Sequence, residues 1–287
     1  MGAKIQEAQR GFICCEADRL RGCDIQLDLP SVGATENIML ASVFAEGETY
    51  IRNAAKEPEI VDLQNYLCGI GVNVSGAGSS VIRIKGGGGK LNDVDHTVIS
   101  DRIVAGTYMI ASAITGGDIL LKSVVPEHLN SVISYLRESG CRINAKRCSI
   151  HISGPQRPKA LDIVRTLPYP GFPTDMQAQM SALLTVARGT SIIVETVFEN
   201  RYKHVDELLK MGANIKVEGR IAVIKGVRKL TGANVYARDL RGGAALVLAG
   251  LAADGETVVH GIRHIERGYE DIGGRLQKLG ALVKTTE

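Results

Sequence analysis

The stretch GTSIIVETVFENRYKHVDELLKMGANIKV, residues 189–217, contains the pattern that organises the whole chain. It opens on a glycine and continues with a β-branched run that is typical of a strand. Apolar residues at helical spacing come next, and they end at Gly212, which suits the left-handed conformation that closes many helices. A second β-branched run follows, so this stretch predicts strand, helix and strand in succession.

The same pattern occurs four times along the chain. Four glycines that each follow a predicted helix are separated by 70, 72 and 66 residues: Gly47, Gly117, Gly189 and Gly255. The second helix of each repeat is closed by another glycine: Gly71, Gly140, Gly212 and Gly280. Alternating helices and strands of this kind favour an α/β architecture in which helices cover sheets. The repeat is longer than a solenoid unit, so small closed domains are expected.

The chain starts in the middle of a repeat. Residues 1–5, MGAKI, nearly match residues 211–215, MGANI, which come late in a unit and after its second helix. We therefore expect that an upstream segment, holding at least the first part of that unit, is absent.

Composition excludes several classes of protein. With 287 residues, 45% of them apolar, the chain can bury a substantial core, and its net charge of +3 does not indicate nucleic-acid binding. No stretch is apolar for long enough to cross a membrane and no signal segment opens the chain, so we expect a cytoplasmic protein. The six cysteines lack the paired spacing of a zinc site.

Polar residues gather at the start of the first helix of each repeat: Ser31 and Gly33, Asp101, Thr174 and Asp175, and Asp239 and Arg241. Helix starts offer free N–H groups and a positive dipole end, which suit phosphates and carboxylates, although capping alone explains any single Ser, Thr or Asp. Arg241 opposes the helix dipole. Its presence predicts a nearby anion or carboxylate, for which Asp239 is one candidate.

A second group of candidates precedes the second helix, where Glu59, Arg201 and Arg267 occupy equivalent positions. The planar fork of arginine suits carboxylates and phosphates. An ordinary surface ion pair is the alternative for either arginine taken alone.

Six segments carry a resemblance to a known family: SVGATENIML from Ser31, NAAKEPEIVDLQNYL from Asn53, FPTDMQAQ from Phe172, TVFENRYKHVDEL from Thr196, DLRGGAALVLAGLAADG from Asp239 and IERGYE from Ile265. In order and in detail they resemble the UDP-N-acetylglucosamine 1-carboxyvinyltransferases. FPTDMQAQ and FENRY separate this family from its relative, 5-enolpyruvylshikimate-3-phosphate synthase.

The resemblance implies inside-out α/β barrel domains built from repeated βαβαββ units, with the first domain truncated. Residues 1–99 would be the truncated portion of one domain and residues 100–287 most of the second. The implied reaction transfers the enolpyruvyl group from phosphoenolpyruvate to UDP-N-acetylglucosamine and releases phosphate, an early step of peptidoglycan and cell-wall synthesis. It implies no metal or organic cofactor, and neither nucleic acid nor membrane as a partner.

The resemblance also assigns residues. Asp175 matches an aspartate that binds the sugar hydroxyl and acts as general base, and Arg267 matches an arginine on phosphoenolpyruvate. The implied catalytic residues are Asp175, Arg267, Asp239 and Arg241. The implied substrate-binding residues are Ser31, Val32, Gly33, Glu59, Thr174, Val197, Phe198 and Arg201.

Some family features have no counterpart in this chain. The upstream loop with its reactive cysteine is one, and the segment around Cys23 is not that loop. We therefore expect the chain to be incomplete for catalysis and to be complemented by the absent N-terminal segment. The alternative is a non-catalytic truncated paralogue that binds a nucleotide sugar or a partner protein. A transferase for a shikimate-type substrate should lack FPTDMQAQ.

Overall fold

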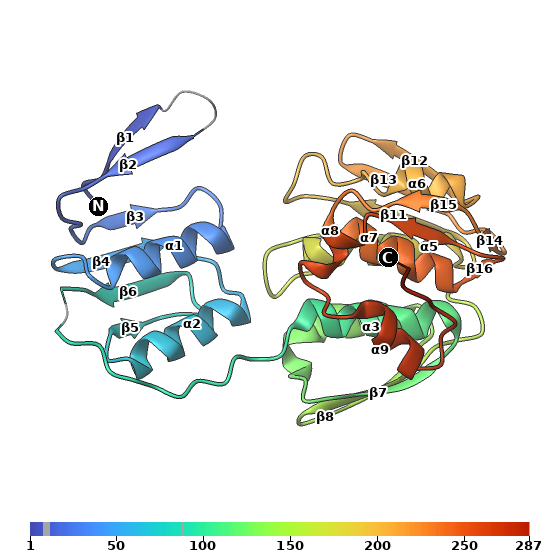
Figure 1. The fold of residues 1–287 in the computed structure, drawn as a ribbon, viewed down its shortest axis with the longest axis horizontal. Helices are drawn as coiled ribbons and strands as arrows, with labels where there is room; N and C mark the ends of the chain where they lie inside the picture. The colour runs from blue at the N-terminus through green and yellow to red at the C-terminus, as the bar shows by residue number, and fades with distance from the viewer. Residues whose placement is uncertain (8–11, 88, 287) are drawn as a thin grey trace. The chain divides into compact units, whose positions relative to one another are not determined.

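The computed structural model describes residues 1–7, 12–87 and 89–286. The chain divides into two compact units, Met1–Ile99 and Ser100–Glu287, and each has a hydrophobic core of its own (Figure 1). The two units are described separately below.

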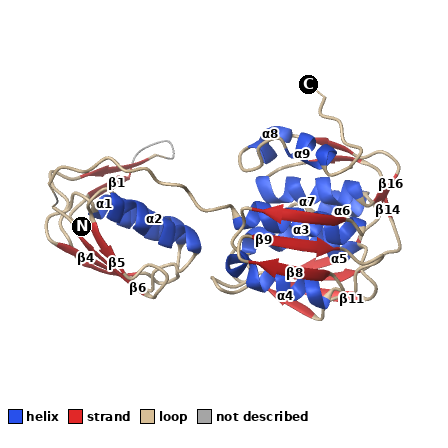
Figure 2. Cartoon of the chain, turned by 90° about the horizontal axis from the view of Figure 1, so that it is seen from below, coloured by secondary structure: helices blue, strands red, loops and turns tan. Residues whose placement is uncertain are grey.

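The first unit contains one complete βαβαββ repeat. Its elements are β3 (Asp24–Gln26), α1 (Val32–Ser42), β4 (Glu48–Arg52), α2 (Pro58–Gly69), β5 (Asn73–Ser75) and β6 (Val81–Lys85). The strands form a sheet in the order β3-β4-β6-β5, in which only β3 and β4 are parallel. Both helices contact each other beside this sheet (Figure 2). An antiparallel hairpin of β1 (Lys4–Glu7) and β2 (Ile13–Glu16) precedes the repeat.

The quoted stretch belongs to a second repeat with the same connectivity. Its elements are β10 (Ile163–Arg165), the short 3-10 helix η2 (Thr174–Met176), α5 (Gln177–Thr185), β11 (Thr190–Val194), α6 (Val205–Lys210), β12 (Asn214–Glu218) and β13 (Ile221–Lys225). The sheet order is β10-β11-β13-β12, again with one parallel pair and two antiparallel pairs. The strand, helix and strand predicted for residues 189–217 are thus confirmed.

Two further repeats complete the second unit. One contains α3 (Arg102–Thr115), β7 (Asp118–Lys122), η1 (Pro126–Leu129), α4 (Asn130–Glu138), β8 (Arg142–Lys146) and β9 (Ser149–Ser153). The other contains β14 (Leu230–Thr231), β15 (Asn234–Tyr236), α7 (Leu240–Leu251), β16 (Ala253–Asp254), β17 (Val258–His260), α8 (Ile262–Glu266) and α9 (Ile272–Lys278). Residues 281–286 form no strand, so the strand expected after Gly280 was wrongly predicted over these described residues.

Helices form the centre of the second unit. Helix α5 packs against both α3 and α7, and all nine of its residues are buried. Alanine, serine and glycine are frequent on α5 and α7, and such small side chains let helix backbones approach closely. In Figure 1 these helices lie between β7 and β8 on one side and β11 to β13 on the other. The inside-out α/β arrangement predicted from the sequence is therefore confirmed.

Helix α1 of the first unit is covered less completely than α5. Its apolar residue Leu40 is 51% exposed, although Met39 on the same helix is fully buried, and Phe44, just beyond the end of the helix, is 66% exposed. Among the described residues, no helix combines the length and the apolar character that crossing a membrane requires.

The helix-ending glycines take the conformation that the pattern predicts. Gly71, Gly140, Gly212 and Gly280 all have positive φ, from 84° at Gly212 to 103° at Gly140. At Gly212 an added Cβ would meet no atom within 4 Å, so conformation alone requires glycine there.

We expect Gly212→Ala to lower the free energy of unfolding by about 1–2 kcal/mol, the cost of placing an L-residue in the left-handed region. Gly212→Asn should cost less, because asparagine tolerates this conformation better. Urea unfolding curves of the three proteins measure both differences. An alanine variant as stable as the natural chain would show that the left-handed backbone at Gly212 is not a constraint.

Candidate active site

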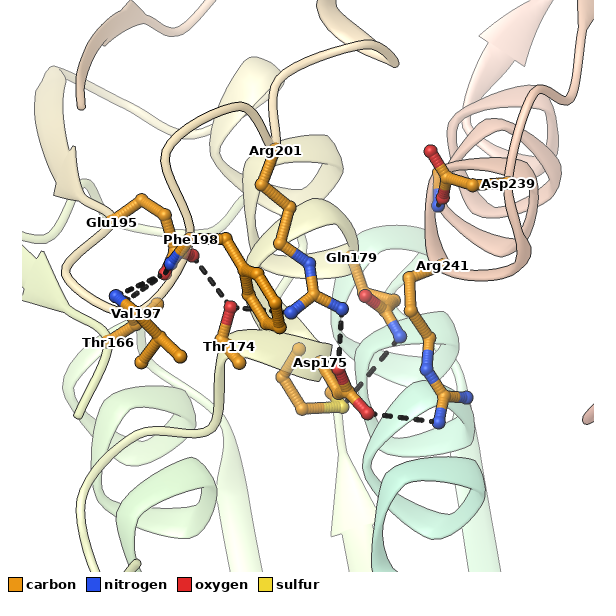
Figure 3. A network of polar contacts seen from close by, with 12 residues as sticks. Thr166, Thr174, Asp175, Gln179, Glu195, Val197, Phe198, Arg201, Asp239 and Arg241 are labelled. Carbon is orange, nitrogen blue, oxygen red and sulfur yellow. Dashed lines mark hydrogen bonds and ion pairs between the residues drawn. The ribbon is translucent and has the colours of Figure 1, made fainter. Parts of the chain in front are cut away.

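Asp175 lies between two arginines that come from different repeats. It is part of η2, just before α5, whereas Arg201 precedes α6 and Arg241 is in the first turn of α7. Arg201 Nη2 donates to Oδ1 of Asp175, and Arg241 Nη2 donates to Oδ2 at 3.3 Å (Figure 3). Each oxygen of this carboxylate therefore faces its own guanidinium group.

The two arginines control the ionisation of Asp175. Burial alone would raise the pKa of this carboxyl, but the positive charges of Arg201 and Arg241, together with their hydrogen bonds, outweigh burial and hold the pKa below its usual range. Asp175 is consequently an ionised carboxylate at neutral pH. It can accept a proton or bind a hydroxyl group.

The carboxylate that offsets Arg241 is Asp175, and not Asp239 as the sequence had suggested. Asp239 is the N-cap of α7, and its Oδ1 accepts a hydrogen bond of 2.7 Å from the backbone N–H of Gly242. Figure 3 shows Asp239 apart from the polar contacts around Asp175. Because this hydrogen bond caps the helix, the side chain of Asp239 is held by the start of α7 and not by Arg241.

Arg241 is also fixed from its other side, by Tyr269. Its guanidinium lies 5.6 Å from the centre of the Tyr269 ring, and Nη1 donates to the tyrosine oxygen at 3.3 Å. The same oxygen is 2.9 Å from Thr107 Oγ1, and Gln179 Nε2 donates to both oxygens at 3.1–3.2 Å. These three residues are buried on α3, α5 and the segment after α8, so Arg241 rests on a polar network inside the helical core.

Glu195 connects Thr174 with the segment that follows β11. Thr174 donates to Glu195 Oε2 at 2.8 Å and accepts a hydrogen bond of 2.6 Å from Arg201 Nη1. Glu195 Oε1 accepts from the backbone N–H groups of Val197 and Phe198 at 2.9 and 3.1 Å. The glutamate is only 1% exposed. Thr174, Val197 and Phe198 are thereby joined to the Asp175 cluster.

Arg201 has a further contact with this segment. Its guanidinium lies 4.7 Å from the centre of the Phe198 ring, which is 51% exposed. An exposed aromatic ring beside a fixed cation is suited to contact with a ring or sugar face of a ligand.

Arg267 differs from the other predicted catalytic residues. It ends α8 and is exposed, and none of the polar contacts of the Asp175 cluster involves it over the described residues. The repeat position that it shares with Arg201 therefore does not give the two arginines the same surroundings.

The remaining predicted residues belong to the first unit. Ser31 is the N-cap of α1, and its Oγ accepts a hydrogen bond from Ala34 N–H at 3.3 Å. Thr35 donates to Ser31 O at 2.8 Å and accepts from Ala55 N–H at 3.1 Å, which ties the start of α1 to the segment before α2. Val32 is partly buried against the core of this unit and Gly33 is exposed.

Glu59 lies in an acidic group. It is in the first turn of α2 next to Glu57, and burial, followed by the negative charges of Glu59 and Glu57, raises the pKa of Glu36 on α1. The structure thus gives Glu59 neighbours of like charge, which suits a hydrogen-bond acceptor better than an anion-binding group.

His204, next to the residues of the Asp175 cluster in the sequence, is deeply buried. It is 4% exposed, and its Nε2 is buried without a hydrogen-bond partner among the described residues. Burial, with a smaller contribution from Arg201, lowers its pKa to about 4, although Asp239 acts in the opposite direction. His204 is therefore neutral at physiological pH.

Sequence reasoning missed Glu195, Gln179 and Thr107 altogether. Glu195 did carry a signal, because it is the only charged residue of the apolar run from Thr190 to Phe198. Gln179 and Thr107 carried none, since a single polar residue on a buried helix face has many interpretations.

The chain is similar to known proteins in sequence and in fold. The profile of the family described as EPSP synthase (3-phosphoshikimate 1-carboxyvinyltransferase) matches residues 1–276. UDP-N-acetylglucosamine 1-carboxyvinyltransferase 2 of Caldanaerobacter subterraneus subsp. tengcongensis is 55% identical over 281 residues, which are 98% of this chain and 67% of that protein. UDP-N-acetylglucosamine 1-carboxyvinyltransferase 1 of Carboxydothermus hydrogenoformans is also 55% identical, over 99% of this chain and 67% of its own length.

The chain belongs to the UDP-N-acetylglucosamine 1-carboxyvinyltransferase family. It spans about two thirds of the length of these curated relatives.

Solved structures of more distant proteins share the fold. The enolpyruvyl transferase NikO from Streptomyces tendae superposes with a TM-score of 0.87 at 24% identity, over 98% of this chain and 69% of that one. EPSP synthase from Acinetobacter baumannii gives 0.75 at 22% identity, over 100% of this chain and 70% of that one. At these identities the likeness shows the enolpyruvyl transferase fold alone.

The buried His204 should make the stability of this family member depend on pH. Above about pH 6.5 the residue is neutral in the folded and unfolded states, but at lower pH only the unfolded chain takes up the proton. The free energy of unfolding should therefore decline between about pH 6.5 and 4, by up to about 3 kcal/mol for this residue. Denaturant titrations across this range measure the decline.

The matched variant is His204→Gln, which cannot titrate. Its unfolding free energy should fall less steeply than that of the natural chain over the same range, whatever its stability at neutral pH. Parallel curves for the two proteins would mean that His204 has the same pKa in the folded and unfolded states, so that burial does not lower it.

Proposed function

We propose that this chain supplies the general base for the transfer of enolpyruvate from phosphoenolpyruvate to UDP-N-acetylglucosamine. The transfer belongs to the synthesis of peptidoglycan precursors in the cytoplasm. The observation that carries the proposal is Asp175, ionised and held between Arg201 and Arg241. Relatives with 55% identity that are named for this transfer support the choice of substrates.

In the proposed mechanism Asp175 accepts the proton of a sugar hydroxyl group. The hydroxyl oxygen then bonds to the second carbon of phosphoenolpyruvate, and a proton enters the third carbon. The resulting tetrahedral intermediate loses a proton from the third carbon and phosphate from the second, which restores the double bond. Proton transfer by a positioned side chain typically accelerates such steps by about 10²–10⁴-fold.

The two arginines would serve both the base and the anionic substrate. While they pair with Asp175 they lower its pKa and make it a weaker base. A phosphate or carboxylate that competes for either guanidinium would loosen this pairing and strengthen the base. Exposed Arg267 is the third cation that we assign to phosphoenolpyruvate.

We assign the nucleotide sugar to the residues that the family resemblance indicates. Thr174, Val197 and Phe198 are connected to the Asp175 cluster through Glu195 and Arg201, and Phe198 offers an exposed ring. Ser31, Val32 and Gly33 at the start of α1 would provide backbone and hydroxyl groups from the first unit. Glu59 and Asp239 complete the proposed set. In this reading residues 1–99 are a portion of one enolpyruvyl transferase domain and residues 100–287 most of the other.

We further propose that catalysis needs the remaining third of the relatives' length, and that this polypeptide can be supplied as a separate chain. The exposed Leu40 on α1 and the exposed Phe44 just after this helix support this, because large apolar residues are buried throughout α5 of the second unit.

The test is phosphate release from phosphoenolpyruvate and UDP-N-acetylglucosamine, measured with this chain alone and with the remaining third of a relative added. We expect release on addition, and Asp175→Asn should reduce it by about 10²–10⁴-fold because an amide cannot accept the hydroxyl proton. Binding of UDP-N-acetylglucosamine should persist in this variant, since its amide oxygen still accepts a hydrogen bond.

Asp206→Asn is the matched control, because this carboxyl lies in the first turn of α6 and takes no part in the Asp175 cluster. No phosphate release in either mixture, with the sugar nucleotide still bound, would favour the non-catalytic paralogue. Unchanged release by the Asp175→Asn chain would remove the base from the mechanism.

A further inference from the structure

The buried carboxylate of Glu195 lies where the two halves of the site meet. Its side chain is 1% exposed and accepts hydrogen bonds at both oxygens. Oε1 faces the segment after β11, and Oε2 faces the Thr174 hydroxyl at the start of η2. A charged side chain is rarely buried to this extent unless such partners stabilise it.

Three donors surround Oε1. They are the backbone N–H groups of Val197 and Phe198, at 2.9 and 3.1 Å, and the hydroxyl of Thr166, at 2.9 Å. The Thr166 oxygen itself accepts from the Thr196 N–H at 2.8 Å. Its proton can reach Glu195 Oε1 at 2.9 Å or Val194 O at 3.5 Å, and the shorter contact with the carboxylate is the stronger one, so Oε1 acts as an acceptor.

The geometry at Oε2 fixes the direction of a chain of hydrogen bonds. Thr174 has one hydroxyl proton, which it gives to Glu195 at 2.8 Å. Its oxygen is then free to accept from Arg201 Nη1 at 2.6 Å, and Nη2 of the same guanidinium pairs with Asp175. The order Asp175, Arg201, Thr174, Glu195 alternates acceptor and donor without conflict.

We propose that Glu195 is a positioning residue, which aims the Arg201 guanidinium at Asp175 through Thr174 and at the same time holds the backbone of residues 197–198. One carboxylate thereby couples the orientation of the base to the wall that we assign to the nucleotide sugar. The inference rests on the proposed function, because that proposal assigns the base and the nucleotide-sugar wall. The hydrogen bonds on which it is built all lie within this chain.

The two oxygens can be tested separately with three variants. Glu195→Asp keeps the negative charge but shortens the side chain by one methylene, so it cannot reach both sides. Thr174→Val removes the two hydrogen bonds, to Glu195 Oε2 and from Arg201 Nη1, that connect the glutamate to Arg201, and it leaves the contacts of Oε1 in place. Thr166→Val, the control, removes a hydrogen bond to the other oxygen of the same glutamate, so it disturbs the buried site to a similar degree without touching the Arg201 link.

The first measurement is the pKa of Asp175, followed by NMR of its carboxyl carbon. The charged groups that face this carboxyl are Arg201 and Arg241, and Tyr269 and Asp101 in turn face Arg241. Glu195→Asp and Thr174→Val should both raise the pKa of Asp175, because Arg201 is then no longer held in the orientation in which it pairs with this carboxylate. The double variant should raise it no further than the larger single effect, since both changes break one link. Thr166→Val should leave it where it is.

The second measurement is hydrogen exchange at the Val197 and Phe198 amides. Exchange should become faster in Glu195→Asp and Thr166→Val, and it should stay unchanged in Thr174→Val. Only Glu195→Asp is expected to alter both readouts.

An Asp175 pKa that does not move in Glu195→Asp or Thr174→Val, or one that moves equally in Thr166→Val, would overturn the positioning role. Additive shifts in the double variant would do the same. None of these measurements requires turnover, so a failure of the proposed transferase activity is recognised separately by the phosphate-release assay.

Discussion

The packing of α5 between α3 and α7 is the constraint on which the second unit depends. Because each of these is the first α-helix of its repeat, stacking them in one core brings their N-terminal ends to the same side. Those ends carry Asp101, Asp175 in η2, and Asp239 with Arg241. Residues that are about 65–75 positions apart in the sequence thereby meet in space, and the sheets remain outside, where each covers its own helices.

Charge inside such a helical core is tolerated only when it is compensated. Arg241 is 15% exposed at its side chain, and it is balanced by Asp175 and by the Tyr269 oxygen. Glu195 is balanced by four hydrogen-bond donors. Burying these groups without partners would cost several kcal/mol each, so the polar network and the helical packing depend on each other.

The same compensation supports the proposed mechanism. A carboxylate with a guanidinium on each oxygen is ionised but restrained, and in the proposal an anionic substrate that binds the arginines would make it more basic. In the proposed mechanism, buried groups such as Glu195 position Arg201, which reduces the reorganisation needed when charge develops.

The sequence by itself determined the repeat, the α/β class, the left-handed glycines such as Gly140 and Gly212, and the family, because all of these follow from local spacing and from motifs read along the chain. It also singled out Asp175, Arg201 and Arg241 one by one. Only the tertiary structure decided that these three form one cluster, that Arg241 pairs with Asp175 and not with the nearer Asp239, and that Arg267 is outside the cluster. It alone revealed Glu195, Gln179 and Thr107. Pairings between repeats depend on how helices that are distant in sequence rotate against each other, and a one-dimensional pattern does not contain that rotation.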